Sequence, residues 1–104
     1  MSEFVRLAGT DEVQEGSAVV RTTEGGQRVA IFNVGGSFHA VSDACVHMGA
    51  SLAGGDVCDG KVRCPLHGWQ FDLGTGHNCM GMGDEVAVQT YAVKVEGGEI
   101  LVSV

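Results

Sequence analysis

Turns that contain glycine are the feature that most restricts the fold of this chain. They occur at Glu24-Gly25-Gly26, Gly35-Gly36, Asp59-Gly60 and Gly97-Gly98, each between apolar or alternating runs. Glycine adopts the positive φ angles that two-residue hairpin turns require. Seventeen glycines against one proline, with no heptad pattern and no long helical stripe, therefore predict an all-β chain of short antiparallel strands.

Alternation of apolar and polar residues predicts eight strands, because side chains along a strand point to opposite faces in turn. The predicted strands are residues 4–8, 18–23, 28–34, 38–42, 61–63, 69–73, 86–95 and 100–104. A chain of 104 residues can build one modest core, so we expect a single domain over residues 1–104. The stretch from about residue 43 to residue 83 is loop-rich and is expected to form an inserted subdomain. A helical turn at 50–53 is only weakly indicated.

Two short runs in this loop-rich stretch carry the side chains that bind metals. The first is Cys45-Val46-His47 and the second is Cys64-Pro65-Leu66-His67, with sixteen residues between His47 and Cys64. Thiolate and imidazole are ligands that iron–sulfur and zinc sites select. Because each run offers one of each, the four side chains suit a binuclear cluster with both sulfurs on one iron and both nitrogens on the other.

Two other uses of these cysteines compete with a cluster. Cys2His2 is also an ordinary ligand set for structural zinc, but zinc sites usually pair like with like, whereas Cys and His alternate here. Four cysteines in a short chain could form two disulfides, which need an oxidising compartment that the first residues do not suggest. The pattern favours the cluster, and colour separates it from zinc because zinc proteins are colourless.

The motif resembles a known family when its flanks are included. C-x-H, sixteen residues, C-P-L-H-G-W-x-F-D and then Thr75-Gly76 resemble the Rieske family, especially its soluble bacterial ferredoxins. The flanking strand pattern is compatible with that family over nearly the whole chain. The resemblance implies the Rieske fold, a small antiparallel sandwich or barrel with a cluster-binding subdomain inserted. It also implies one [2Fe-2S] cluster held by Cys45, His47, Cys64 and His67.

The resemblance implies a one-electron carrier that performs no substrate chemistry. A flavin-containing ferredoxin reductase is expected to load the electron, and a terminal oxygenase is expected to receive it. The alternative is a Rieske-like small subunit of a larger reductase, such as an assimilatory nitrite reductase. A complete Rieske oxygenase is excluded by length, because its mononuclear iron needs a 2-His-1-carboxylate triad on a further domain.

The net charge of the chain restricts the classes of partner that it can bind. Thirteen Asp and Glu against six Lys and Arg give a formal charge of -7, which disfavours nucleic acid because nothing neutralises the phosphates. A basic protein surface, bound by weak and salt-sensitive contacts, is the expected partner. The first residues show no signal peptide, and no apolar run approaches the roughly 18 residues of a membrane span. We therefore expect a cytoplasmic monomer.

Differences from high-potential Rieske proteins predict a low reduction potential. By the resemblance, high-potential members carry an extra cysteine in each ligand loop and a serine after the His-Gly of the second loop. This chain has Ala50 and Leu66 at the cysteine positions and Trp69 at the serine position. Fewer donors near the sulfurs, together with the acidic net charge, leave the reduced state less stabilised. We expect a midpoint potential of about -150 mV rather than +300 mV.

The remaining cysteines and histidines have simpler explanations than metal binding. Cys58 and Cys79 lie outside the motif, and small buried hydrophobic side chains explain them better than a second cluster. His39 lies in an alternating run and is expected to point to solvent, opposite to the core side of its strand. His77 lies in a turn between glycine and asparagine and is expected to be exposed.

Overall fold

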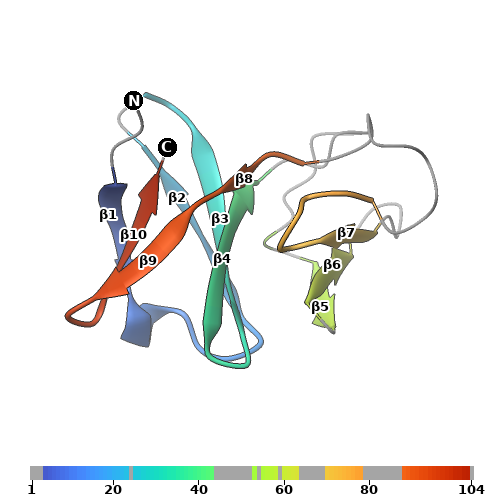
Figure 1. The fold of residues 1–104 in the computed structure, drawn as a ribbon, viewed down its shortest axis with the longest axis horizontal. Helices are drawn as coiled ribbons and strands as arrows, with labels where there is room; N and C mark the ends of the chain where they lie inside the picture. The colour runs from blue at the N-terminus through green and yellow to red at the C-terminus, as the bar shows by residue number, and fades with distance from the viewer. Residues whose placement is uncertain are drawn as a thin grey trace.

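The computed structural model describes residues 4–23, 25–43, 53, 55–58, 60–63, 70–78 and 88–103, with only the backbone of Asp56 and Cys58. Within these residues the chain forms short strands and one 3-10 helix (Figure 1). The elements are β1 (Phe4–Gly9), η1 (Thr10–Glu12), β2 (Ala18–Thr22), β3 (Arg28–Val34), β4 (Ser37–Ser42), β5 (Asp56–Cys58), β6 (Lys61–Arg63), β7 (Gln70–Asp72), β8 (Thr90–Tyr91), β9 (Val93–Glu96) and β10 (Glu99–Ser103).

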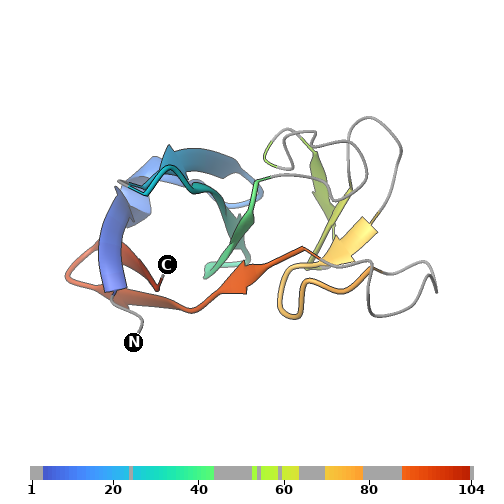
Figure 2. The same ribbon diagram turned by 90° about the horizontal axis from the view of Figure 1, so that it is seen from above.

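The strands form three antiparallel sheets that divide between two lobes. The barrel lobe combines one sheet of order β1-β10-β9 with a second of order β2-β3-β4-β8, and the small lobe is the sheet β5-β6-β7. Figure 2 shows the two barrel sheets curving round a common interior, with the small lobe beside them. The chain leaves the barrel lobe after β4 and returns to it at β8, so the small lobe is an insertion, as the sequence predicted.

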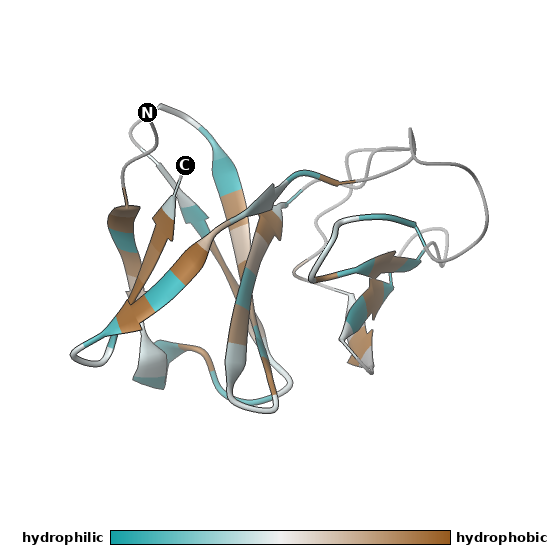
Figure 3. Cartoon of the chain, in the orientation of Figure 1, coloured by the Kyte–Doolittle hydropathy of each residue, from teal (hydrophilic) through white to brown (hydrophobic). Residues whose placement is uncertain are grey.

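Strand β3 is buried on both faces and joins two hydrophobic cores. Val29 and Ile31 point into the barrel lobe, and Ala30 and Phe32 point towards the small lobe. The barrel core comprises Ala8, Val13, Val29, Ile31, Ala40, Ile100 and Val102. The core between the lobes comprises Ala30, Phe32, Val41, Val62, Phe71, Leu73 and Val88. The continuous apolar run of β3, visible in Figure 3, follows from this double burial.

The structure confirms the all-β prediction and most of the predicted turns. Gly26, the pair Gly35-Gly36, Gly60 and the pair Gly97-Gly98 all have positive φ, as hairpin turns at these places require. The predicted strand at 28–34 has the observed bounds of β3, and the predicted strand at 61–63 has those of β6. The predicted helical turn at 50–53 lies outside the described residues except for Ala53.

One strand prediction was wrong in detail and one strand was missed, both for a tertiary reason. The run 86–95 was predicted as one strand, but it contributes β8 to the second barrel sheet and β9 to the first. One alternating run can serve two sheets when the chain crosses between them, which local pattern does not reveal. Strand β5 was not predicted, because Asp56-Val57-Cys58 is too short to show alternation and forms only by pairing with β6.

Gly76 fixes the position where the chain turns back towards the barrel lobe. Its φ is +79°, its N–H donates to the Asp72 carbonyl at 2.7 Å, and its carbonyl accepts from the Val88 N–H at 2.8 Å. A Cβ atom at this position would lie 2.1 Å from the Val88 carbonyl oxygen. Gly76 therefore meets both a backbone and a steric requirement for glycine.

We predict that Gly76→Ala lowers the free energy of unfolding by roughly 2–5 kcal/mol, combining the cost of a left-handed residue with overpacking. The matched control is Gly35→Ala, which shares a positive φ of 60° but has no heavy atom within 4 Å of the added Cβ. It should cost only about 1–2 kcal/mol. Chemical denaturation of both variants measures the difference, and equal losses would contradict the steric explanation.

Glu12 connects three elements of the barrel lobe through its carboxylate. Oε2 accepts from the Gly9 N–H at 2.7 Å, and Oε1 accepts from Arg21 Nη2 at 2.8 Å. Arg6 lies 3.6 Å from the same carboxylate and also pairs with Glu99 of β10 at 3.0 Å. The Gly9 N–H, followed by the Arg21 guanidinium, holds the pKa of the Glu12 carboxyl below its usual range.

This lowered pKa predicts a loss of stability in acid. A carboxyl whose pKa is lower in the folded chain stabilises it above the unfolded pKa, and this contribution disappears as the pH falls through the folded pKa. We expect the wild type to lose thermal stability below about pH 4.5 more steeply than Glu12→Gln. Glu15→Gln, which removes an exposed charge outside this network, should keep the wild-type slope. Melting temperatures measured between about pH 6 and about pH 3 provide the comparison.

Candidate metal centre

The four predicted ligands, Cys45, His47, Cys64 and His67, lie outside the described residues. The described residues define both ends of the two segments that carry them, 44–52 and 64–69. These ends show how the fold positions the ligand-bearing segments.

The second ligand segment connects two paired strands. Strand β6 ends at Arg63 and β7 begins at Gln70, and these two residues are direct register partners. Behind them, Val62 and Phe71 are also partners, and both are fully buried in the core between the lobes. The ends of segment 64–69 are thus held by a backbone ladder whose inner face is packed against β3.

The first ligand segment is closed by a side chain. Asp43 follows β4 directly, and its N–H donates to the Arg28 carbonyl at 3.0 Å, which continues the contact between β4 and β3. Its Oδ1 accepts a hydrogen bond of 2.9 Å from the N–H of Ala53, at the other end of segment 44–52. Ala53 is partly buried against the core between the lobes.

The ends of both segments gather at one end of the small sheet. Asp56, which begins β5, is the register partner of Arg63, which ends β6, and Arg63 is in turn the partner of Gln70. Ala53 precedes Asp56 by three residues. The described residues that flank the two segments therefore lie towards the same end of one sheet, which is compatible with a binuclear cluster that needs one thiolate and one imidazole from each segment.

Two basic side chains lie on strand β6, which leads into the second ligand segment. Lys61 and Arg63 are exposed on the same face of β6, opposite to buried Val62, and Arg63 directly precedes Cys64. Arg6, Arg21, Arg28 and Lys94 each form an ion pair. Within the described part of the chain, no ion pair is formed by Lys61 or Arg63. Although the chain is acidic overall, Arg63 therefore places a positive charge next to the second ligand segment.

The structure corrects the prediction for His39 and confirms that for His77. His39 is the register partner of Phe32, on the face of β4 that points towards the small lobe, and it is partly buried rather than solvated. It lines a groove of about 360 Å³ with Leu73 and Tyr91. The prediction that His39 lies on the opposite face of β4 from Ala40 was right, but that face packs towards the small lobe instead of facing open solvent. His77 is exposed.

The remaining predicted residues are only partly described. Cys58 ends strand β5, and its side chain, like all of Cys79, lies outside the described residues. Within the described ranges, no group of three or more His, Cys, Asp and Glu side chains could hold a metal ion.

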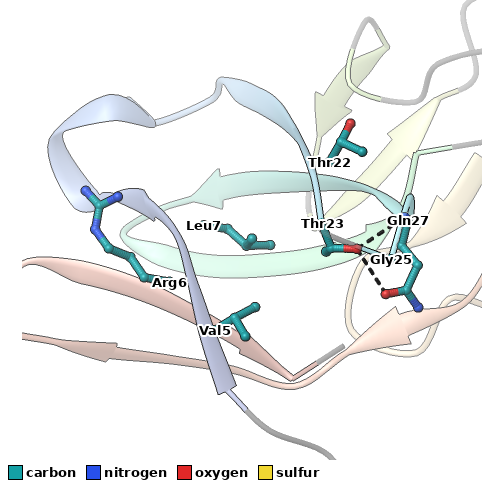
Figure 4. Close-up of a pocket in the computed structure, with 7 residues that line it drawn as sticks. All are labelled: Val5, Arg6, Leu7, Thr22, Thr23, Gly25 and Gln27. Carbon is teal, nitrogen blue, oxygen red and sulfur yellow. Dashed lines mark hydrogen bonds between the residues drawn. The ribbon is translucent and has the colours of Figure 1, made fainter.

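A second hollow, of about 410 Å³, lies on the barrel lobe between β1 and β2 (Figure 4). Its lining includes Val5, Leu7, Thr22 and the Thr23 and Gln27 pair, whose hydrogen bonds are drawn there. The described lining offers hydroxyl, amide and guanidinium groups and no cysteine, histidine or carboxylate. It has no chemistry in common with the metal centre.

Sequence reasoning missed Asp43. The available signal was a single acidic residue at the end of an apolar strand, two positions before Cys45. Its burial and its bond to Ala53 depend on tertiary contacts, so its role is visible only in the fold.

Comparison with known proteins identifies the class that this fold and ligand pattern define. The sequence profile of the Rieske [2Fe-2S] domain matches residues 3–92. The chain belongs to the Rieske [2Fe-2S] domain family, and its cofactor is one [2Fe-2S] cluster. It is 39% identical over 105 aligned residues to the ferredoxin component of the p-cumate 2,3-dioxygenase system of Pseudomonas putida, covering 100% of this chain and 88% of that protein.

Solved structures with the same fold include carriers and small subunits. The ferredoxin of carbazole 1,9a-dioxygenase from Nocardioides aromaticivorans IC177 has a TM-score of 0.86 and 32% identity, covering 96% of each chain. A chain in a complex of reduced oxygenase and oxidized ferredoxin in carbazole 1,9a-dioxygenase has a TM-score of 0.86 and 28% identity, covering 96% of this chain and 92% of that one. A putative NADH-dependent nitrite reductase small subunit from Mycobacterium tuberculosis has a TM-score of 0.88 and 25% identity, covering 100% of this chain and 96% of that one.

In the part of the chain that the structure describes, no helix is long and apolar enough to cross a membrane.

Proposed function

We propose that this chain is a Rieske ferredoxin, which carries single electrons from a flavin-containing reductase to a terminal oxygenase. The observation that carries the proposal is the match over its full length to the ferredoxin component of a dioxygenase system. The carbazole dioxygenase complex supports the choice of an oxygenase as acceptor, because one of its chains has this fold. On this proposal the chain transfers electrons and catalyses no substrate reaction.

The proposed cluster ligands are Cys45 and Cys64 on one iron and His47 and His67 on the other. The anchoring of both ligand segments to one end of the β5-β6-β7 sheet supports this assignment, as does the alternation of Cys and His. When bound, the cluster supplies storage for one electron. We further propose that residues 1–104 form one Rieske domain in which about residues 43–83 are the cluster-binding subdomain.

The described residues support a rigid and dry base for these ligands. Val62, Phe71 and Leu73 are buried at 0–2% exposure and pack the small sheet against Phe32 of β3. Dense packing limits movement of the sheet that anchors the ligand segments. A carrier benefits because its two oxidation states then differ little in structure.

The acidic charge supports a carrier that exchanges partners. A net charge of -7 permits long-range attraction to a basic protein surface, while permanent subunits usually bury more hydrophobic interfaces. We therefore propose a cytoplasmic monomer that docks transiently. The alternative is a nitrite reductase small subunit. Two structural neighbours carry that description, at 25% and 23% identity, and both values are below the 39% shared with the dioxygenase ferredoxin.

The ligand assignment predicts a clear difference between the cysteines. Cys64→Ser should reduce bound iron and acid-labile sulfide by about tenfold or more, because a hydroxyl is a poor replacement for the thiolate that clusters select. Cys58→Ser is the matched control and should retain both. Elemental analysis and the EPR spectrum of the dithionite-reduced proteins provide the measurement. Retention of a normal cluster by Cys64→Ser would refute the assignment.

The carrier proposal predicts salt-sensitive reduction. The second-order rate of reduction by the flavoprotein reductase should fall by about tenfold between roughly 0.02 M and 0.5 M salt, since screening shortens the range of attraction between surface charges. Stopped-flow absorbance measures the rate, and circular dichroism at both salt concentrations controls for unfolding. A rate indifferent to salt, together with a reductase that co-purifies in a fixed ratio, would favour the subunit alternative.

A further inference from the structure

Asp43 is a buried acidic residue at the start of the first ligand segment. The residue is 1% exposed, and its side chain is 0% exposed. Its Oδ2 lies 3.2 Å from Arg28 Nη2, and the Arg28 side chain is 59% exposed. A buried carboxylate needs hydrogen bonds and an opposite charge to offset its lost hydration. Ala53 and Arg28 provide these, so the position of the carboxylate is tightly defined.

The bond to Ala53 restrains the first ligand segment. Segment 64–69 leaves and re-enters a backbone ladder at Arg63 and Gln70, but segment 44–52 has its ends joined through the Asp43 carboxylate. Ala53 is itself packed against the core between the lobes. Asp43 thus joins β4, β3 and the far end of the segment that carries Cys45 and His47.

Asp43 is two residues from the proposed ligand Cys45, so the covalent chain limits the distance between them. Two residues of extended chain span at most about 7 Å, so the Cα atoms of Asp43 and Cys45 are no further apart than this. A charge in a poorly solvated position acts on its neighbours more strongly than a charge exposed to water. Among the described residues, Asp43 is the one ionisable residue that is buried.

We propose that Asp43 is a positioning residue that sets both the geometry of the first ligand segment and part of the reduction potential of the cluster. This inference rests on the proposed ligand assignment. The carboxylate holds the two ends of the segment together through Ala53. Its negative charge opposes the arrival of an electron, and the positive charge of Arg28 partly cancels that effect.

The charge effect can be separated from structural damage by its sign. Asp43→Asn keeps an oxygen that accepts from the Ala53 N–H but removes the negative charge, so it should raise the midpoint potential. Arg28→Gln removes the compensating positive charge and should lower it. Each change is expected to alter the reduction equilibrium at least about threefold, which is about 28 mV for one electron at 59 mV per tenfold change.

The barrel lobe offers a matched control pair. Arg6 and Glu99 form an ion pair of 3.0 Å with half-exposed side chains, on strands that carry no predicted ligand. Glu99→Gln and Arg6→Gln therefore make the same charge changes away from the small lobe. Redox titration should show shifts for this pair that are well below those for Asp43→Asn and Arg28→Gln.

The restraint on the segment is tested by removing the hydrogen bond as well. Asp43→Ala should release iron to a chelator about tenfold faster than Asp43→Asn, and its EPR spectrum in the reduced state should broaden. If Asp43→Ala does not fold, Asp43→Ser replaces it in this comparison, because its hydroxyl oxygen is one bond nearer the backbone than the Oδ1 that accepts from the Ala53 N–H.

Three results separate the possible failures. Shifts of the same sign in Asp43→Asn and Arg28→Gln, or shifts no larger than those of the control pair, would overturn the inference about charge. Equal iron release from Asp43→Ala and Asp43→Asn would overturn the positioning role. A wild-type protein without iron and sulfide after anaerobic reconstitution would instead count against the proposed function.

Discussion

The double burial of β3 is the constraint on which the rest of the structure depends. Its alternate residues enter two cores, one inside the barrel lobe and one between the lobes. Either lobe alone would leave one face of this strand in water, at a cost set by the apolar area exposed. The small sheet is therefore packed against the barrel lobe through the same strand that completes the barrel core.

The two ligand segments reach this rigid base by different means. The second begins and ends within a β ladder, where backbone hydrogen bonds fix its ends without help from any particular side chain. The first depends on the Asp43 carboxylate, which contacts both Ala53 and Arg28. A carrier needs ligands that hold still in both oxidation states, and the residues that flank the two proposed ligand segments are held by backbone pairing in one case and by a buried carboxylate in the other.

Charge is distributed unevenly over the molecule. In the barrel lobe, Glu12 and Glu99 are tied to Arg6 and Arg21, which leaves η1 and the neighbouring turns with acidic side chains such as Asp11 and Glu15 at the surface. On β6, Lys61 and Arg63 are exposed, and Arg63 adjoins the second ligand segment. The net charge of -7 favours long-range attraction to a basic surface, while β6 presents exposed cations of its own.

The sequence by itself determined the strand class, the glycine turns, the existence of an insertion and the Cys and His motif from which the family was predicted. These are local properties, because turn geometry, alternation and ligand type are encoded within a few residues. The tertiary structure decided that β5 exists, that one alternating run divides into β8 and β9, that His39 is partly covered, and that Asp43 closes the first ligand segment. Each of these depends on contacts between residues distant in sequence, whose pairing is fixed by packing of the whole chain rather than by the preference of any short segment.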